Sequence, residues 1–375
     1  MRSILALLAL GACTASALVV PARTDANNLK RDILRKFSKR QSVTSGVDDA
    51  TVLQFALTLE HLENSFYSEA LSMFNASSFA DAGFDGLYPV LQQVGRDEAA
   101  HVEFLTTALS AAGATPVQAC NYTFPMTDVK SFLALSQVVE GVGVSAYLGA
   151  AGSINTTAYL TAAASILTVE ARHAAALQFI HGYQPAPQPN DTPLSASNVV
   201  TIVSPFFSSC PDGSAPTIEG NPALNVTTSS PKIGEAISVA PVNSSAVNTD
   251  GTVYCGFASG LSAGFSTWSN GSCEIPSQNV TTGQTYVVLT TGPSLSDNSI
   301  IAGPAILSLG TPNITLSKVG ATNSSTGTMN TGTGTGGSAG SSGMSGTGGG
   351  NGAATLKTGL AGAAAALIGA LALVV

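Results

Sequence analysis

Two four-residue runs in this 375-residue chain each pair a glutamate with a histidine at helical spacing. The runs are Glu98-Ala99-Ala100-His101 and Glu170-Ala171-Arg172-His173. Residues three apart project from the same face of an α-helix, so each run presents a carboxylate and an imidazole to one point in space. Both runs lie in apolar segments, and together they predict a metal site built from two helices.

Two further glutamates complete a ligand set for two metal ions. Glu60 and Glu140 lie in the apolar segments that precede the two Glu-x-x-His runs. Two single glutamates plus two Glu-x-x-His pairs form a binuclear site in the core of a four-helix bundle. Four buried carboxylates repel one another, and two divalent cations neutralise them. Because carboxylate and imidazole suit both metals, we expect two iron or manganese ions. The predicted ligands are Glu60, Glu98, His101, Glu140, Glu170 and His173.

A repeated spacing distinguishes Glu60 from its neighbour Glu63. Tyr67 follows Glu60 by seven residues, and Tyr147 follows Glu140 by the same interval. Two helical turns separate each pair, so each tyrosine can face the cavity and hydrogen-bond a ligand. We therefore rank Glu60 above Glu63 as a ligand and place both tyrosines at the catalytic centre. Glu63 is predicted to transfer protons or to act as an extra ligand; the alternative is a solvated helix face.

Four helices must position these residues. Apolar residues recur at helical intervals over 49–74, 88–112, 128–151 and 155–182. The stretch 75–86, rich in Asn, Ser, Asp and Gly, is predicted to be a loop. Four helices of similar length favour an antiparallel four-helix bundle over residues 48–183.

The composition changes beyond Pro185. A linker is predicted over 184–214, and short β-type runs separated by Gly, Asn, Ser and Pro follow it. These runs are 236–240, 252–257, 285–290 and 300–309. They predict a small antiparallel β-sandwich over 215–315, with Trp268 in its core. The predicted fold class is therefore α+β and multidomain.

Both ends of the chain carry processing signals. Residues 1–17 have the basic start, the apolar run and the small-residue end of a secretory signal peptide. Residues 18–40 end in a dibasic pair, which predicts a propeptide; the alternative is a basic linker. Residues 316–351 form a low-complexity stalk of Gly, Ser, Thr and Asn. The apolar tail in 352–375 is typical of a glycosylphosphatidylinositol (GPI) signal, with Asn351 as the attachment site.

Trimming these ends makes the chain strongly acidic. Eight of the 14 basic residues precede Gln41 and Lys357 lies in the tail, which leaves 5 basic against 20 acidic residues, a net charge of −15. Such a surface excludes nucleic acid and anionic lipid headgroups as partners. Ten Asn-x-Ser/Thr sequons predict a glycosylated exterior. They begin at Asn75, Asn121, Asn155, Asn190, Asn225, Asn243, Asn270, Asn279, Asn313 and Asn323.

Four cysteines remain once Cys13 leaves with the signal peptide. An even number in a secreted chain predicts two disulfides, for which three pairings exist. We favour the pairing in which each disulfide closes around one predicted domain. Its two disulfides are Cys120 with Cys210 and Cys255 with Cys273.

The order Glu, Glu-x-x-His, Glu, Glu-x-x-His resembles the ferritin-like di-iron carboxylate proteins, such as rubrerythrin, bacterioferritin and manganese catalase. The run 57–67 (LTLEHLENSFY), together with Gly283-Gln284-Thr285-Tyr286 and Ala302-Gly303-Pro304-Ala305, is similar to fungal secreted ferritin-like proteins, called stress-response or late sexual development proteins. The resemblance covers about 50–315. It implies a four-helix bundle with the six ligands above, but no particular reaction. Sequons near the helix ends argue against a closed ferritin cage.

Three functions fit these features. The first is a cell-surface di-iron or di-manganese oxidoreductase of catalase, peroxidase or ferroxidase type, acting on peroxide, oxygen or ferrous iron. The second is a structural or adhesive cell-wall glycoprotein with the bundle as scaffold. The third is metal sequestration without turnover. The complete ligand set favours the first over the second. The expected location is the outer face of the plasma membrane or the cell wall, reached through the GPI anchor, with cell-wall glucan as a further partner.

Overall fold

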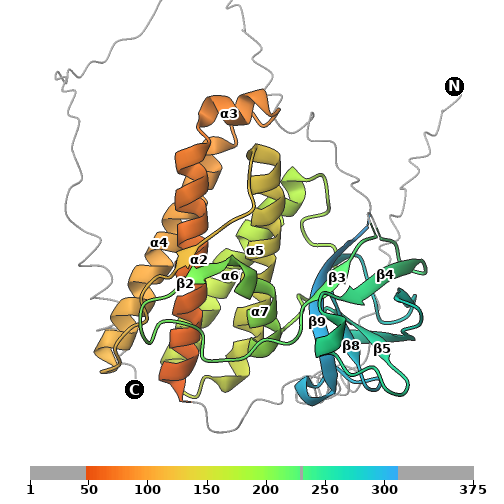
Figure 1. Ribbon diagram of the computed structural model, residues 1–375. Coiled ribbons are helices and arrows are strands. Elements are labelled where there is room, and N and C mark those ends of the chain that lie inside the picture. The colour runs from red at the N-terminus through yellow and green to blue at the C-terminus, as the bar shows by residue number, and fades with distance from the viewer. Residues whose placement is uncertain (1–47, 229–230, 311–375) are drawn as a thin grey trace, which may run out of the picture.

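The computed structural model describes residues 48–228 and 231–310, which form a helical bundle with a β-sandwich beside it (Figure 1). The predicted signal peptide, propeptide, stalk and anchor signal, including Asn351, lie outside the described residues.

Four long helices form the bundle, and their ends follow local sequence signals. Asp48 and Asp128 cap two of the helices by accepting backbone N–H bonds. Gly113 and Gly182 follow the other two with φ of 79° and 78°, a left-handed conformation that glycine adopts without strain. The four predicted helices are thus confirmed with small shifts at their ends. They are α2 (Asp49–Met73), α4 (Tyr88–Ala111), α5 (Val129–Ala150) and α6 (Thr157–Ile180).

The connection over 112–128 sets the direction of α5. Near its start, Gln54 on α2 donates to the carbonyl of Thr115. Farther along, Phe124 packs against Phe66 with ring centroids 5.1 Å apart. The connection therefore runs along α2, so α5 begins at the same end of the bundle as α4. Helices α2 and α4 are antiparallel, as are α5 and α6, but α4 and α5 run the same way, which is the arrangement that one long crossover produces.

Two segments predicted to be irregular contain short elements. Helix α3 (Ala76–Asp81) lies in the predicted loop and is capped by Asn75. The predicted linker holds α7 (Ala196–Val203), followed by the 3-10 turn η2 (Ser204–Phe206) and β2 (Phe207–Ser209). Helix α7 packs against both α5 and β9 (Ile300–Leu309), so this segment fills the space between bundle and sandwich. An apolar run of two helical turns carries too little periodicity to be distinguished from a strand.

Two antiparallel sheets form the sandwich, and a short ribbon joins β1 (Asn121–Tyr122) to β2. The first sheet has the order β3-β4-β7 and the second β6-β5-β8-β9. The predicted runs correspond to β4, β5, β8 and β9, whereas β3, β6 and β7 were not predicted. The remaining bounds are β3 (Leu224–Val226), β4 (Ala236–Pro241), β5 (Tyr254–Ser259), β6 (Ser262–Thr267), β7 (Ser272–Glu274) and β8 (Gly283–Thr290).

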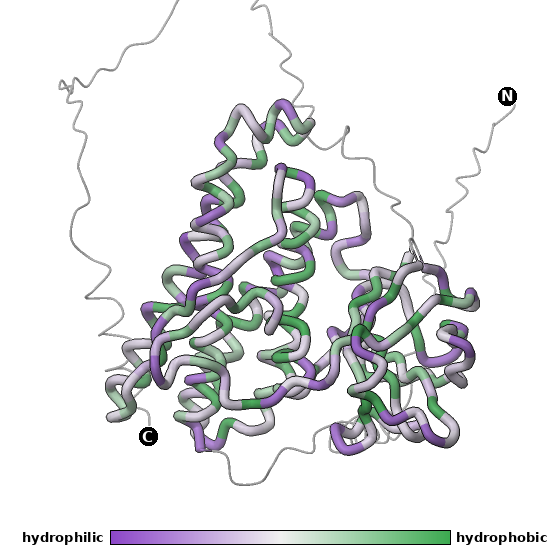
Figure 2. Tube along the Cα trace, viewed as in Figure 1, coloured by the Kyte–Doolittle hydropathy of each residue, from purple (hydrophilic) through white to green (hydrophobic). Residues whose placement is uncertain are grey.

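The sandwich core is apolar and cross-linked. Buried side chains from both sheets, among them Ile237, Phe257 and Leu289, form one cluster, and Trp268 packs against it. Hydrophobic and hydrophilic segments are interspersed over both domains (Figure 2). The disulfide Cys255–Cys273 joins β5 to β7 and so links the two sheets. The other predicted pair, Cys120–Cys210, also forms and ties the long crossover to the segment after α7.

Helix α5 is the element shared by the two domains. Residues 129–153 are long and apolar enough to cross a membrane, but 61% of the most apolar window is buried in the molecule, as in the core helix of a bundle. One face of α5 receives the sandwich: the Tyr286 hydroxyl hydrogen-bonds Ser145 at 2.7 Å and donates to the Gly141 carbonyl at 3.1 Å. A Cβ on Gly141 would lie 2.2 Å from Gln284 Oε1, so glycine lets the Gln284 side chain lie against α5 in its present position.

Candidate metal centre

The ligand residues occupy the core-facing stripe of their helices. On α4 the buried positions run Leu91, Val94, Glu98, His101 and Leu105. On α6 the same spacing runs Ala163, Ile166, Glu170, His173 and Leu177. The stripe on each helix is otherwise apolar, so helical phase alone directs a carboxylate and an imidazole from each helix into the bundle core.

All six predicted ligands converge at the centre of the bundle. They form two overlapping groups, and within each group the candidate ligand atoms lie within 4.8 Å of one another. Glu98 and Glu170 belong to both groups, which places them to bridge two ions, whereas each other ligand belongs to one group. The groups are Glu60, Glu98, His101 and Glu170, and Glu98, Glu140, Glu170 and His173.

His101 faces three carboxylates through Nδ1. This nitrogen lies 3.2 Å from Glu60 Oε2, 3.3 Å from Glu98 Oε2 and 3.1 Å from Glu170 Oε1. The imidazole and the three carboxylates come from three different helices. Nδ1 is therefore the atom of His101 that would bind a metal ion.

His173 repeats this arrangement on the other side. Its Nδ1 lies 3.0 Å from Glu98 Oε1 and 3.2 Å from Glu140 Oε2. Its outer nitrogen, Nε2, lies 3.3 Å from Asp97 Oδ2. A carboxylate at the outer nitrogen fixes the ring orientation and makes the inner nitrogen a better ligand. Sequence reasoning missed Asp97, although an acid directly before Glu98 was available as a signal.

The two tyrosines are paired crosswise between helices. Tyr67 on α2 donates to Glu140 on α5 at 2.5 Å, and Tyr147 on α5 donates to Glu60 on α2 at 2.5 Å. Burial and the neighbouring carboxylates raise the pKa of both phenols well above the usual value, so both hydroxyls stay protonated and donate. The expectation that each tyrosine hydrogen-bonds a ligand is confirmed.

Glu63 is a fifth buried carboxylate beside the ligands. It belongs to neither ligand group and is only 3% exposed, so the alternative of a solvated helix face is wrong. A Cβ on Gly143 would lie 2.7 Å from Glu63 Oε1 and 3.2 Å from Glu170 Oε2, so glycine leaves the room that these carboxylates occupy. Burial and the charges of the other glutamates, Glu170 first, raise the pKa of Glu63 well above its usual value.

The imidazoles hold protons strongly in this environment. Burial lowers their pKa, but the surrounding carboxylates outweigh burial and raise the pKa of His101 to about 12 and that of His173 to about 11. Both rings are therefore positively charged at neutral pH when carboxylates are their only partners. A metal ion would have to displace these two protons.

The carboxylates divide by the number of imidazoles that they contact, because Glu98 faces both and each of the others faces one. Burial and the charge of Glu98 raise the pKa of Glu60 to about 7, and burial raises the pKa of Glu140 as well. Burial and the charges of Glu98 and Glu140 raise the pKa of Glu170 well above its usual value. Glu98 differs: burial acts in the same upward direction, but contacts with both imidazoles lower its pKa overall.

The donor set fits a pair of metal ions. Glu98 Oε1, Glu140 Oε2 and both oxygens of Glu170 are buried and make no hydrogen bond with the described residues. Of these atoms, all but Glu170 Oε2 face a histidine nitrogen at ion-pair distance. Buried polar atoms are rarely left unsatisfied, and such atoms call for a functional explanation. Divalent cations would satisfy these oxygens and neutralise the carboxylates, and the mixture of carboxylate and imidazole suits iron or manganese.

The other two histidines lie outside the centre. His61 is half-buried and its Nε2 lies 3.1 Å from the Val117 carbonyl in the crossover. His181 is the C-cap of α6.

Comparison with known proteins agrees with this geometry. Residues 48–182 match the family model described as a ferritin-like domain, and this segment contains all six ligands and both tyrosines. No curated protein matches the chain. The match covers the helical region and does not extend to the sandwich.

Proposed function

We propose that this protein is a binuclear iron or manganese oxidoreductase that acts on peroxide, oxygen or ferrous iron. The observation that carries the proposal is the pair of ligand groups that share Glu98 and Glu170. When bound, two such ions supply redox and Lewis-acid chemistry to a small oxidant. The bundle supplies a site closed off from bulk water by apolar side chains.

The residues of the chain have distinct roles in this proposal. Glu60 and Glu140 each hold one ion, and the crossed tyrosines fix the orientation of these two carboxylates. Burial and the charge of the neighbouring Glu170 raise the pKa of Glu63 well above its usual value, which favours the protonated form. Glu63 can therefore give a proton to a substrate oxygen and recover it later, which suits a general acid and base.

A purely structural bundle is the second candidate, and the buried charges argue against it. Burial of five glutamates in one core lowers the free energy of unfolding. Apolar residues of similar volume would stabilise a purely structural bundle better. All six ligands are nevertheless present and brought together.

Metal analysis of the secreted protein tests the proposal. We expect about two iron or manganese ions per chain, and we expect the double variant H101A/H173A to lose them. The double variant H61A/H181A is the matched control, because both histidines lie outside the centre and metal content should be unchanged. Metal loading followed by assays of peroxide consumption and ferrous oxidation separates turnover from sequestration. Full metal content in H101A/H173A would contradict the proposal.

We also propose that the protein is secreted and GPI-anchored. The two disulfides support an oxidising compartment, because such bonds are rare in the cytosol. The terminal signals in the sequence support export and anchoring. We expect phosphatidylinositol-specific phospholipase C to release the protein from intact cells. If the variant N351Q is anchored as efficiently as the unchanged protein, Asn351 is not the attachment site.

A further inference from the structure

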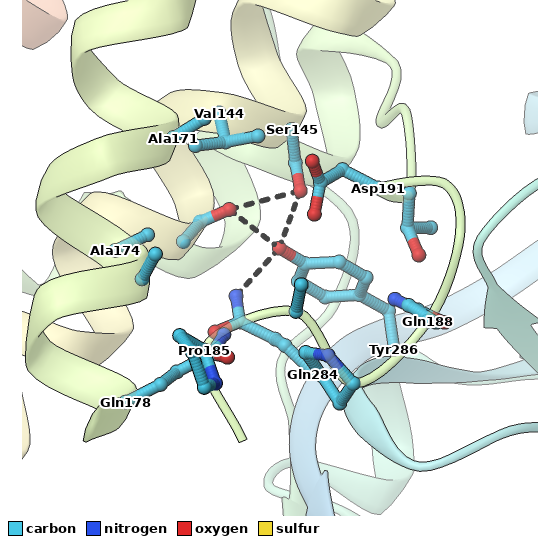
Figure 3. A pocket seen from close by; sticks show the side chains of 15 residues that line it. Val144, Ser145, Ala171, Ala174, Gln178, Pro185, Gln188, Asp191, Gln284 and Tyr286 are labelled. Carbon is cyan, nitrogen blue, oxygen red and sulfur yellow. Dashed lines mark hydrogen bonds between the residues drawn. The ribbon is translucent and has the colours of Figure 1, made fainter. Parts of the chain in front are cut away.

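A groove with two compartments lies where the sandwich meets α5 and α6. The first compartment has a volume of about 230 Å³ and the second about 160 Å³. They share Gln178, Pro187 and Gln284, which form a common wall. Figure 3 shows the first compartment, with Gln178 from α6 and with Gln284 and Tyr286 from β8.

The groove is separate from the metal centre. Ala171 and Ala174 line it and directly follow Glu170 and His173 in the sequence. Consecutive residues point about 100° apart around a helix, so α6 presents its ligands to the bundle core and these alanines to the groove. Small side chains on this face leave the space that the groove occupies.

Amide side chains dominate the polar lining. Five of the chain's 11 glutamines line the two compartments, which is a strong concentration in so small an area. Asp191 is the one charged side chain among the described lining residues, and none of these residues is basic. The groove therefore offers no cation to an anionic ligand such as phosphate. The five are Gln137, Gln178, Gln184, Gln188 and Gln284.

These amides are held in place by the fold. Gln284 donates to the Tyr286 hydroxyl at 2.7 Å, and that hydroxyl is bonded to Ser145 on α5 (Figure 3). Gln188 accepts a hydrogen bond from Thr281 at 2.8 Å. Fixed polar groups lose little conformational entropy when a ligand binds, so the groove is preorganised.

Gln178 stands at the wall between the compartments with an unused acceptor. Its Oε1 is buried and makes no hydrogen bond with the described residues. Rotation of the side-chain amide toward the groove would let a ligand hydroxyl donate to this atom, which is otherwise costly to bury. Amides can also donate, so glutamines suit a ligand whose groups both donate and accept, as sugar hydroxyls do.

We propose that this groove binds a short neutral oligosaccharide, with one sugar ring in each compartment. The combined volume, about 390 Å³, is within the roughly 300–1,000 Å³ of small-molecule sites, whereas each compartment alone is smaller. Tyr183 and the shared Pro187 supply apolar surface for the C–H faces of the rings. This site is independent of the proposed metal chemistry.

Isothermal titration with defined sugars tests the proposal. The probes are glucose and the disaccharides and tetrasaccharides of glucose with α-1,4, β-1,4 and β-1,3 linkages, added to the metal-loaded, enzymatically deglycosylated protein. We expect saturable binding of at least one series, with the disaccharide about tenfold tighter than glucose, because a second ring adds hydrogen bonds of about 1 kcal/mol each. The tetrasaccharide should gain little more, because two compartments hold two rings.

Three variants locate the binding. Q178L removes the shared amide and should weaken disaccharide binding about 3- to 10-fold. Q184A changes an exposed lining residue, cannot disturb the core, and should also weaken binding. Q278L is the matched control, because Gln278 is an exposed glutamine of the sandwich outside both compartments.

Any of three results would overturn the proposal. One is the absence of saturable binding to every sugar by protein whose circular dichroism and metal content are normal. Another is binding that Q178L and Q184A leave unchanged. Binding of choline in place of sugars, lost in D191N, would assign the groove to organic cations and would also contradict the proposal.

Discussion

The cores of the two domains are built from opposite kinds of side chains. The sandwich interior is filled by apolar side chains and closed by the Cys255–Cys273 disulfide. The centre of the bundle instead holds five carboxylates and two imidazoles, all less than 9% exposed. Both domains have apolar clusters around these centres, so the difference lies in a single layer of the bundle.

This difference indicates what each core is for. Apolar packing and a cross-link stabilise the sandwich without any further partner. The charged layer of the bundle is expensive to bury, and its repulsions are relieved only by protons or by metal ions. The bundle core is therefore suited to the metal binding proposed above, and the surrounding apolar layers hold its carboxylates and imidazoles in place.

Removal of a shared carboxylate should have the largest effect. Glu170→Gln takes a ligand from both groups, so we expect loss of both ions, whereas Glu60→Gln should lose one. The measurement is metal content by elemental analysis after dialysis. Glu274→Gln, an exposed carboxylate of the sandwich, is the control and should keep both ions. Equal metal content in the Glu170 and Glu60 variants would show that the shared and single ligands are not distinct.

The disulfides should differ in the stability that they give. Cys120–Cys210 closes a separation of 90 residues and Cys255–Cys273 one of 18. By the chain-entropy relation, replacement of each pair by alanine should cost about 4–5 and about 3 kcal/mol of unfolding free energy. Calorimetry of the two double variants measures this. A larger loss for the sandwich pair would mean that packing of the buried cysteines outweighs loop closure.

The metal-free protein should lose stability as the pH rises. The folded state holds protons on Glu60, with a pKa of about 7, and on His101 and His173, with pKa values of about 12 and 11. In the unfolded chain the pKa of the glutamate is near 4.5 and that of each histidine near 6.5. Between its unfolded and its folded pKa each group binds more proton in the folded state, so the unfolding free energy falls as the pH rises through that range. Glu60 alone should lower the unfolding free energy by roughly 3 kcal/mol as the pH rises from 4.5 to 7.

Urea unfolding at pH 5, 6, 7 and 8 measures this slope. The manganese-loaded protein is the comparison, and its stability should rise with pH because metal binding displaces the same protons. The same slope with and without metal would contradict the assignment of these groups to the metal centre.

Substitution of two tyrosines should have the smallest effects, and it separates metal binding from the contact between the domains. Tyr147→Phe removes a hydrogen bond to Glu60 and should weaken metal binding about tenfold. Tyr286→Phe removes a hydroxyl from the joint between the domains and should lower the unfolding free energy by about 1 kcal/mol with no change in metal affinity. Competition with a metal indicator dye separates the two effects. Similar metal affinities for both variants would show that the crossed pairing does not orient the ligand.

Local spacing made most of the bundle predictable. The helix bounds, the caps and the choice of Glu60 over Glu63 all depend on residues within two turns of one another. The pairing of the cysteines was also predicted, because each pair encloses a domain. Strands β3 and β7 were missed because they have three residues each, and β6 because it is rich in small polar residues and poor in the β-branched and aromatic residues that indicate a strand. The short helices α3 and α7 were also missed, since one or two turns contain too little periodicity to indicate a helix.

The sequence by itself determined which residues face the metal centre, because helical geometry sets the direction of each side chain relative to its neighbours. Only the tertiary structure decided which residues meet across helices. It made Glu98 and Glu170 the shared ligands, crossed the two tyrosines, and placed Asp97 against His173. It also formed the glutamine-lined groove from segments distant in the chain. Contacts between elements depend on how whole helices and sheets pack, and no local spacing specifies that.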